Sequence, residues 1–541
     1  MQITSQNLDH LGLVAGMCDE LEIARIIDGI TGDQAHNKHL TYGQAVVAMI
    51  LNGLGFVSRT LYLYSEYFED KPVGRLLGNT ATPSHLDDNV LGRTLDKLFS
   101  IGVTDLFTKI ALKALKKLGI KVKALHLDST SFHVDGEYES SIEQGESRIQ
   151  LVPGYSRDHR PDLNQAVLQL MTTSQGNLPL YMQAADGNAN DKTAFCEIVS
   201  QHLKSFKEAL DNRYFIGDSA LYVEKTIQLL DKEKHLFITR VPMQIKEAKD
   251  AIINVQQKDM IDIGEGYKAC EYSSDYGGVQ QRWIIIFSKA AYERECHTLK
   301  KNFIKGSERE AKEFFKIQRL EFKCLCDAQK YLDKFLERQK YIDIIDTKIV
   351  PVEKRMKAGR PKKNEVKDVV GYKIEGFVIA KIEKKQELEK QKGYFLLATN
   401  DLDVVNCPPQ EVLALYKAQQ SVERGFRFLK SPDFLVSSFF LKKPERIEAL
   451  LMVMTLCLLV YAAIEYKIRE KLQETGEKFP DQKKRPSQKP TARWVFFCFL
   501  GLHIVSIEGQ QKQVTNLKER HKIILMCLGP PYQKFYYSEM W

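Results

Sequence analysis

Residues 122–132 read VKALHLDSTSF, and the hydrophobic pattern of the chain changes at this stretch. Before it, apolar residues recur every three or four positions, as they do on one face of a helix. From Val122 onward they form short runs that end in polar residues, which is typical of buried strands. The change of period predicts a helical segment followed by a sheet.

The elements after this point alternate in a regular order. The pattern predicts three strands, a helix, a strand, a second helix and a further strand, which favours a mixed sheet with helices packed on its faces. We therefore expect an α/β fold. The predicted strands are 122–127, 163–173, 178–184, 214–217 and 235–240, with a turn at Gln175-Gly176-Asn177, and the predicted helices are 191–206 and 223–231.

The 541 residues are enough for about three domains. Gly and Pro positions, charge runs and changes of period divide them into five segments. The expected segments are an N-terminal helical domain (1–118), the first part of the α/β core (119–240), a charged α+β insertion (241–390), the second part of the core (391–475), and a basic linker with a C-terminal helical segment (476–541).

Composition restricts the protein class only mildly. The 78 Lys and Arg against 70 Asp and Glu give a net charge of +8, which permits nucleic acid binding without requiring it. The ten cysteines are scattered and form no CxxC pair, so reduced thiols in a cytoplasm are expected. The N-terminal residues MQITSQNLDHLG lack a secretory pattern.

One apolar run resembles a membrane span. Ala449 to Ala463 reads ALLMVMTLCLLVYAA and is shorter than the roughly 20 residues that a bilayer requires. We expect a buried core helix and no membrane association.

Three carboxylates stand at informative positions. Asp128 and Asp218 each follow an apolar run, and Glu423 lies beyond the insertion. If the first and fourth strands are neighbours, the two aspartates converge, and a later helix can bring the glutamate over them. Clustered carboxylates repel one another unless cations intervene, and oxygen ligands suit Mg²⁺ or Mn²⁺. The alternative for each Asp alone is a cap or turn residue.

The glutamate belongs to the stretch 416–430, YKAQQSVERGFRFLK. We expect one helix from about Gln410, with Tyr416, Gln419, Glu423 and Lys430 near one face. Its other side would bury apolar residues. The alternative is an ordinary solvated amphipathic helix. The residues expected to face the core are Val422, Phe426 and Leu429.

Two further polar segments are candidate DNA contacts. The loop at 154–162, GYSRDHRPD, contains Arg157, His159 and Arg160. These residues either line a DNA path or are ordinary residues of a polar loop without a role in DNA binding. The cluster KRMKAGRPKK at 354–363 resembles the core of an AT-hook through its Gly-Arg-Pro. A basic loop that contacts phosphates nonspecifically is the alternative. Under either interpretation, the residues of this cluster expected to contact DNA are Arg360, Lys362 and Lys363.

The blocks VKALHLDSTSF, RYFIGDSALY and YKAQQSVERGFRFLK, in this order, resemble the catalytic blocks of DDE transposases of bacterial insertion sequences, which have a ribonuclease H-like core. The last block resembles their Y-R-E-K signature, Y-x2-R-x3-E-x6-K. Tyr416, Glu423 and Lys430 match it, whereas Gln419 replaces the arginine. The resemblance covers about 122–465, and an insertion before the glutamate is common in that group.

The resemblance implies movement of a DNA segment by strand cleavage at terminal inverted repeats and joining of the 3′ hydroxyls to target DNA. Asp128, Asp218 and Glu423 would hold two Mg²⁺ ions, for which Mn²⁺ can substitute. Tyr416, Lys430, Gln419 and Arg427 would contact DNA.

The resemblance also implies binding partners and a cellular compartment. Double-stranded element ends and target DNA would be bound by a homodimer, in the cytoplasm of a prokaryote and at its nucleoid. The N-terminal domain would bind DNA ends or dimerise. Two alternatives stay open, a ribonuclease H-like nuclease without strand transfer and a decayed transposase that only binds DNA. Because Gln419 carries no charge, hairpin formation at the excised end is not assumed.

Overall fold

The chain forms two compact units in the computed structural model. The first contains Met1–Arg240, Asp275–Gln281 and Thr399–Trp541, and the second contains Val241–Ser274 and Arg282–Ala398. The five-segment division stays a prediction. The residues described are 3–32, 39–56, 63–78, 81–134, 149–155, 160, 162–190, 193, 195–198, 200, 214–255, 257–354, 368–430, 441, 443–507 and 512–537.

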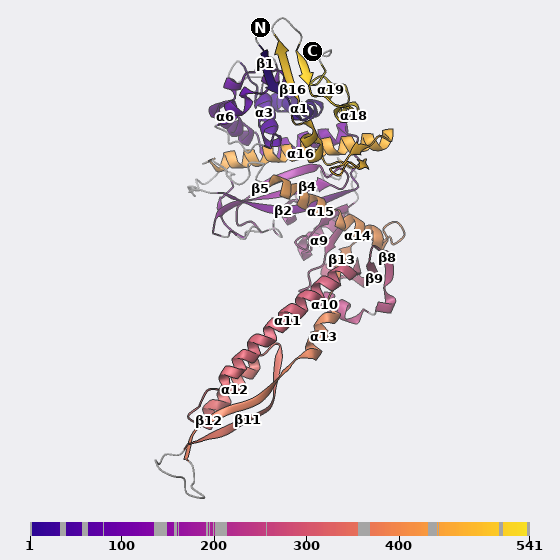
Figure 1. The fold of residues 1–541 in the computed structure, drawn as a ribbon. Coiled ribbons are helices and arrows are strands. Elements are labelled where there is room, and N and C mark those ends of the chain that lie inside the picture. The colour runs from indigo at the N-terminus through magenta and orange to yellow at the C-terminus, as the bar shows by residue number, and fades with distance from the viewer. Residues whose placement is uncertain are drawn as a thin grey trace. The chain divides into compact units, whose positions relative to one another are not determined.

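The N-terminal part of the first unit is helical, as expected (Figure 1). The Oγ1 of Thr41 accepts a hydrogen bond from the Gln44 amide at 3.1 Å and so caps one helix. Asp87 accepts from the Val90 amide at 2.8 Å and caps another. The helices are α1 (Leu11–Glu20), α2 (Ile23–Thr31), α3 (Tyr42–Leu54), α4 (Tyr64–Glu69), α5 (Val73–Leu77), α6 (Asp88–Ser100) and α7 (Val103–Lys117).

The C-terminal segment, predicted as a basic linker and a helical segment, contains strands as well as helices. Strand β1 (Ile3–Asn7) pairs antiparallel with β16 (His503–Ile507), which also pairs with β17 (Gln513–Thr515). The sequence ITSQN is short and polar, and its partner lies almost 500 residues away, so no local pattern reveals it. The other C-terminal elements are β14 (Phe479–Pro480), β15 (Pro486–Ser487), α17 (Ala492–Phe499), α18 (Glu519–Leu528) and α19 (Pro530–Gln533).

The α/β core is built on one long central strand. Strand β2 (Ala124–Val134) pairs antiparallel with β4 (Asn164–Thr173) on one side and parallel with β6 (Tyr214–Gly217) on the other. The other edge of β4 carries β3 and β5, and β7 runs parallel to β6. This is a ribonuclease H-like mixed sheet, as expected. The remaining bounds are β3 (Val152–Pro153), β5 (Pro179–Ala185) and β7 (Leu236–Arg240).

The predicted 163–184 hairpin is confirmed by this pairing. The first and fourth strands are neighbours, which is the condition for the two aspartates to converge. The turn between β4 and β5 has positive φ at Gly176 (77°) and Asn177 (54°). Gly and Asn tolerate that conformation best. Most of the predicted helix 191–206 lies outside the described residues.

Helix α16 (Pro444–Thr475) forms the centre of the first unit. It contacts α1, α3 and α6 of the N-terminal helices and strand β5 of the sheet (Figure 1). Among the described helices it alone is long and apolar enough to cross a membrane, but 83% of its most apolar window is buried inside the protein. A helix that buries all of its faces is the core helix expected from 449–463.

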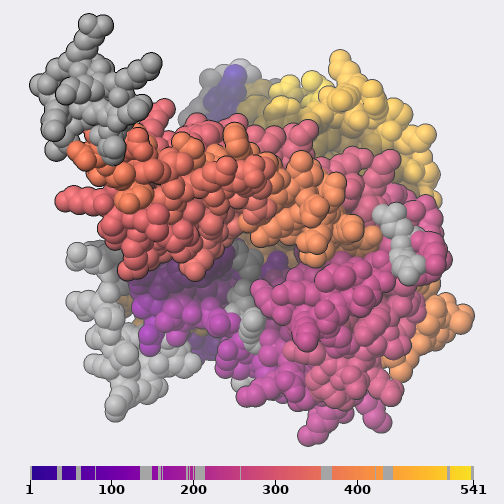
Figure 2. All heavy atoms as spheres, turned by 90° about the horizontal axis from the view of Figure 1, so that it is seen from below, coloured from indigo at the N-terminus to yellow at the C-terminus, as the bar shows by residue number. Residues whose placement is uncertain are grey.

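The second unit combines a small sheet with a helical and hairpin arm. Strands β13, β10, β9 and β8 lie side by side in this order. The 13-residue strands β11 and β12 form a hairpin that contacts helices α11 and α12, and the coral and orange atoms of this part of the chain lie together in Figure 2. The elements are α10 (Lys246–Asn254), β8 (Ile261–Gly264), β9 (Tyr267–Ser274), β10 (Gln281–Ser288), α11 (Lys289–Ile317), α12 (Leu325–Arg338), β11 (Ile342–Lys354), β12 (Asp368–Ala380), α13 (Ile382–Lys390) and β13 (Tyr394–Thr399).

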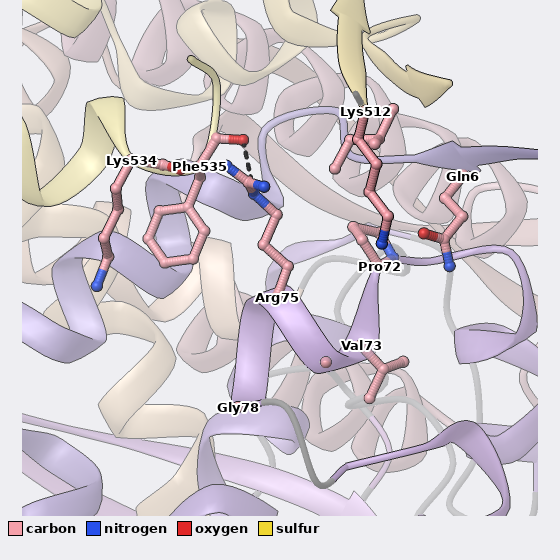
Figure 3. A pocket seen from close by; sticks show the side chains of 10 residues that line it. Gln6, Pro72, Val73, Arg75, Gly78, Lys512, Lys534 and Phe535 are labelled. Carbon is pink, nitrogen blue, oxygen red and sulfur yellow. Dashed lines mark hydrogen bonds between the residues drawn. The ribbon is translucent and has the colours of Figure 1, made fainter. Parts of the chain in front are cut away.

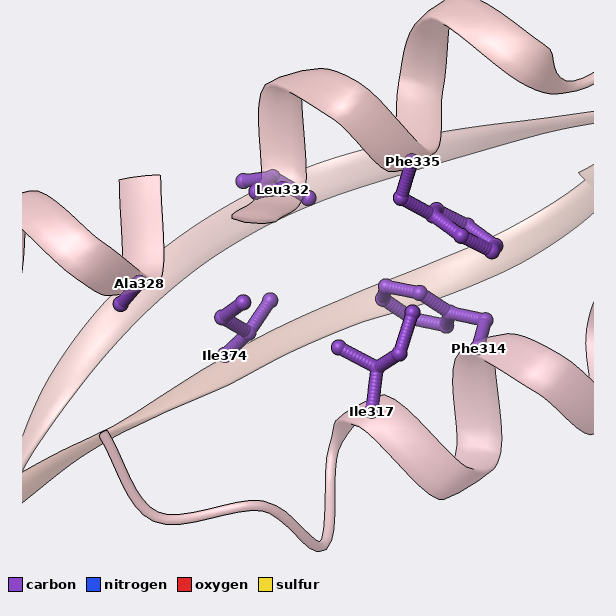
Figure 4. Close-up of a cluster of buried hydrophobic side chains, with 6 residues drawn as sticks. All are labelled: Phe314, Ile317, Ala328, Leu332, Phe335 and Ile374. Atoms are coloured by element: carbon purple, nitrogen blue, oxygen red, sulfur yellow. The ribbon is translucent and has the colours of Figure 1, made fainter. Parts of the chain in front are cut away.

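A small core of its own holds the arm together. Phe314 of α11 stacks on Phe335 of α12 with ring centres 5.6 Å apart, and Ile374 of β12 is fully buried beside them (Figure 4). The highly charged sequence of the helices therefore leaves one narrow apolar stripe that packs on the hairpin.

Candidate active site

Asp128 and Asp218 occupy neighbouring positions on two parallel strands. In the β2–β6 pairing Leu127 lies opposite Gly217, so the two aspartates are the next residue on each chain. Asp128 is buried, and its Oδ1 accepts a hydrogen bond from the Ser129 amide at 2.8 Å. Oδ1 of Asp218 accepts from the Ala220 amide at 2.9 Å. Both carboxylates are thus fixed at one edge of the β2–β6 pair.

The expectation that Asp128 ends its strand was wrong. Strand β2 continues to Val134 because β4 pairs with it over ten residues, up to Val134 opposite Asn164. The parallel partner β6 ends at Gly217, so Asp128 lies just beyond the β6 ladder although it is in the middle of β2. Asp218 does follow the end of its strand, as predicted.

The expected single helix is two helices. Helix α14 spans Pro409–Lys417 and α15 spans Gln420–Leu429. At the junction the amides of Gln419 and Val422 bond three residues back instead of four, to Tyr416 and Gln419 respectively. The break lets α14 contact β6 and β7 while α15 contacts β2 and α16, which one straight helix could not do.

The apolar face of α15 is as predicted. Val422, Phe426 and Leu429 are buried, whereas Glu423 is exposed. Gly425 allows a close approach to α16, because a Cβ there would lie 3.1 Å from Leu458 Cδ2. The glutamate is consequently held on the solvent side of a firmly packed helix.

The electrostatic surroundings of Tyr416 connect the three carboxylates. Burial is the main cause that raises the pKa of its hydroxyl to about 12. The charge of Arg240 opposes this rise, and the charges of Asp218, Asp128 and Glu423 add to it. The hydroxyl of Tyr416 therefore lies in the field of all three acidic residues and of one arginine.

Arg240 is the site residue that sequence reasoning missed. It is exposed at the end of β7, next to β6, on the strand HLFITR. Neighbouring parallel strands end at the same edge of a sheet. The position of Arg240 at the end of the fifth predicted strand could therefore have indicated that it lies near Asp218.

Lys430 lies at the end of α15, and its ammonium is 5.6 Å from the centre of the Phe132 ring on β2. Gln419 is buried at the α14–α15 junction, and its Oε1 has no hydrogen-bond partner in the described part of the chain. The polar residues of the stretch are therefore not one uniform face, because Gln419 is enclosed and Glu423 is not.

Two predicted DNA contacts are described at exposed positions. Arg427 is exposed on α15. Arg160 forms an exposed ion pair with Asp162 at 2.9 Å, which is worth little in water. Arg427 lies four residues after Glu423 on α15, and the role of both arginines in DNA binding stays a prediction. Arg157, His159, Arg360, Lys362 and Lys363 lie outside the described residues.

A family model described as "Transposase DDE domain" matches residues 123–460, from the start of β2 to the middle of α16. The chain belongs to this family. DDE transposases cleave and transfer phosphodiesters with divalent metal ions, and transposition of DNA is the corresponding function. A second model, described as a domain of unknown function, matches residues 3–112.

One solved structure similar to this transposase is entitled "Cryo-EM structure of piggyBac transposase synaptic complex with hairpin DNA (SNHP)". The similarity covers 92% of this chain and 83% of that chain, with 11% sequence identity and a TM-score of 0.39. No curated protein matches the sequence significantly.

The carboxylates of the transposase fit a divalent metal by their chemistry. Three acidic residues around one hydroxyl, with Arg240 as the opposing charge, repel one another in the absence of a further cation. Carboxylate oxygens are the ligands that Mg²⁺ and Mn²⁺ prefer. Within the described residues, however, no three Asp, Glu, His or Cys side chains are grouped closely enough to hold a metal ion as they stand.

Proposed function

We propose that this protein is the transposase of an insertion sequence. It binds the terminal inverted repeats of its element, cleaves a DNA strand at each end and joins the freed 3′ hydroxyls to target DNA. One observation carries the proposal, namely that the β2–β6 pairing places Asp128 next to Asp218 and that α15, which carries Glu423, contacts β2.

Asp128, Asp218 and Glu423 hold two Mg²⁺ ions, and Mn²⁺ can replace them. When bound, such ions activate an attacking water or hydroxyl and stabilise the leaving oxygen of a phosphodiester displacement. Asp128 and Asp218 are fixed on β2 and β6, whereas the exposed Glu423 is the carboxylate with most freedom to turn toward them. This difference explains how a site can form on binding from side chains that are not yet grouped.

Tyr416 and Lys430 bind the substrate phosphate. With a pKa near 12, the Tyr416 hydroxyl stays protonated at neutral pH, so it donates a hydrogen bond and does not act as a base. Lys430 supplies a positive charge from the end of α15. Arg427, Arg157, His159, Arg160 and the basic cluster with Arg360, Lys362 and Lys363 contact the DNA backbone further away.

Gln419 replaces the arginine of the Y-R-E-K signature, but its side chain can still form hydrogen bonds. The amide is buried at the helix break and can donate to a DNA oxygen, but it adds no charge. The protein acts as a homodimer that pairs two element ends, in the prokaryotic cytoplasm and at the nucleoid. Its N-terminal domain binds DNA ends or the second subunit.

The test uses purified protein, Mg²⁺, a pre-nicked element end and a target plasmid. Wild-type protein should yield joined product, and Asp218→Asn should abolish both cleavage and joining. The asparagine oxygen can still accept from the Ala220 amide, so this variant should fold. The control is Asp105→Asn, an exposed position on α7.

Each alternative has its own outcome. Cleavage without joining would make the protein a ribonuclease H-like nuclease. DNA binding without Mg²⁺-dependent cleavage would make it a decayed transposase. Cleavage by Asp218→Asn at the wild-type rate would contradict the assignment of the site.

A further inference from the structure

A pocket of about 760 Å³ lies in the first unit, between the N-terminal helices and the C-terminal strands (Figure 3). Its volume is in the range of ligand-binding sites. Segments from both ends of the sequence form it, because α5 supplies one wall and β16 and the chain after α19 supply others. The lining residues are Gln6, Pro72, Val73, Gly74, Arg75, Gly78, Ile504, Lys512, Lys534 and Phe535.

The charged lining of the pocket is entirely positive. Arg75, Lys512 and Lys534 line it, and among the described residues no Asp or Glu does. Lys512 is exposed, and no ion pair joins it to another residue in the described ranges. Lys534 pairs with Asp19 at 2.7 Å and lies 4.9 Å from the centre of the Phe535 ring. Even with that pair, the pocket carries an excess of positive charge.

Arg75 also fixes the shape of the pocket. Its Nε donates to the carbonyl oxygen of Phe535 at 3.1 Å, and its Nη2 donates to that of Lys534. The guanidinium thus ties α5 to the residues after α19. Burial lowers the pKa of Arg75 to about 10, so it keeps its charge at neutral pH.

We propose that this pocket binds phosphates of the DNA backbone. The proposal rests on the proposed function, since it adds a second contact to the same DNA substrate. In Figure 1, α16 separates the strands β1 and β16 at the pocket from the sheet that carries the carboxylates. The phosphates bound here are therefore different from the one that is cut.

The composition of the pocket identifies the part of DNA that is bound. Lysine is a point charge that suits phosphate, and contacts to phosphate carry no sequence information. Gln6 is committed to the Lys71 carbonyl oxygen at 3.2 Å. Exposed Gly78 and Lys512 leave the pocket open to solvent, as a continuous DNA strand requires. The expected contact anchors the substrate independently of its sequence.

The experiment measures DNA affinity without catalysis. Full-length wild-type and Lys512→Gln/Lys534→Gln proteins are titrated in EDTA with a fluorescent duplex that carries an element end, at several KCl concentrations. The control variant is Lys116→Gln/Lys522→Gln, which removes the same charge from two exposed lysines outside the pocket. Thermal unfolding shows whether each variant is folded.

The pocket variant should bind about five- to twentyfold more weakly. Its plot of log K against log salt should lose a slope of about one for each lysine removed, and the control should keep the wild-type slope. Ethylation interference provides a second measurement. Phosphates whose ethylation weakens the wild-type complex should lose that effect in the pocket variant.

Three results would overturn the proposal. The first is wild-type affinity and salt slope in a folded pocket variant while wild-type protein cleaves element ends, which leaves the proposed function intact. The second is calorimetric binding of inorganic pyrophosphate that the pocket variant loses while its DNA affinity is unchanged, which makes the pocket a small-anion site. The third is wild-type protein that neither binds nor cleaves element ends, which removes both proposals.

Discussion

The ammonium of Lys430 lies 5.6 Å from the ring centre of Phe132, four residues beyond Asp128 on β2. Side chains four residues apart on a strand project from the same face. The end of α15 is therefore held over the face of the sheet from which Asp128 projects. A cation–π contact of this kind is worth about 0.5–2 kcal/mol.

Replacing Lys430 should impair chemistry more than folding. Lys430→Gln should slow Mg²⁺-dependent cleavage by roughly 10- to 100-fold, because a hydrogen bond to a charged group contributes about 1.5–3 kcal/mol. Lys430→Arg should retain most of the rate. Single-turnover cleavage of a labelled element end measures both, and equal rates for wild type and Lys430→Gln would refute the phosphate contact.

Mg²⁺ should stabilise the protein through the carboxylates. Ligand bound to the folded state raises the free energy of unfolding by about 1.4 kcal/mol at ten times its dissociation constant. The melting temperature should therefore rise by a few degrees with Mg²⁺ and fall again on adding EDTA. Asp128→Asn should reduce this shift, whereas Asp105→Asn should not. An undiminished shift in Asp128→Asn would place the metal elsewhere.

Arg240 should act as the countercharge of the metal-free site. Arg240→Gln should lower the melting temperature in EDTA and enlarge the rise caused by Mg²⁺, because the carboxylates then lack their opposing charge. Arg424→Gln, at an exposed position on α15, is the control. If the two variants respond alike, Arg240 is not part of the site.

Glu448 near the start of α16 should make stability depend on pH. Burial raises the pKa of its carboxyl to about 7, the Ile149 amide opposes that rise, and Glu445 and Asp186 add to it. Its Oε2 has no hydrogen-bond partner among the described residues. The raised value favours the folded state below pH 4.5, and this contribution is lost as the pH rises through 7.

Glu448→Gln imitates the protonated carboxyl. It should be more stable than wild type at pH 8, by an amount of the order of 1–3 kcal/mol, and similar to wild type near pH 4. Denaturant unfolding at the two pH values measures the difference. A constant difference between variant and wild type across this range would show that Glu448 does not titrate near 7.

Replacing two glycines of the N-terminal helices by alanine should change the stability of the protein in opposite directions. At Gly43 of α3 a Cβ would lie 2.6 Å from Ala24 Cα of α2, so Gly43→Ala should destabilise the protein by about 1–3 kcal/mol. At Gly29 of α2 a Cβ meets no atom within 4 Å, so Gly29→Ala should stabilise by about 0.5–1 kcal/mol. Thermal unfolding of the two variants is the measurement, and destabilisation by both would contradict the packing argument.

The sequence pattern within single elements predicted those parts of the site that depend on residues close together in the sequence. The position of Asp218 after its strand and the buried stripe with Val422 and Phe426 follow from periodicity within one element. The order of the elements predicted a mixed sheet, and the condition that its first and fourth strands are neighbours is met by the parallel pairing of β2 with β6.

The features that were missed depend on distant partners. The helix break at Gln419 arises because α14 and α15 pack on different strands, which the periodicity of the stretch does not contain. Strand β2 extends beyond Asp128 because β4 pairs with it. Arg240 gains its significance only where Tyr416, from the other side of the insertion, lies in its field.

The pairing of β1 with β16 has a consequence for how the protein is made. Ile3 pairs with Ile507, so strand β1, once it is made, waits for a partner encoded some 500 residues later. At about 5–20 residues per second, this delay is roughly 25–100 s. The pocket with Arg75, Lys512 and Lys534 is assembled only after that time. A nascent or truncated chain that does not reach Lys512 and Lys534 would therefore lack this anchor, so the pocket could not contribute to its capture by DNA.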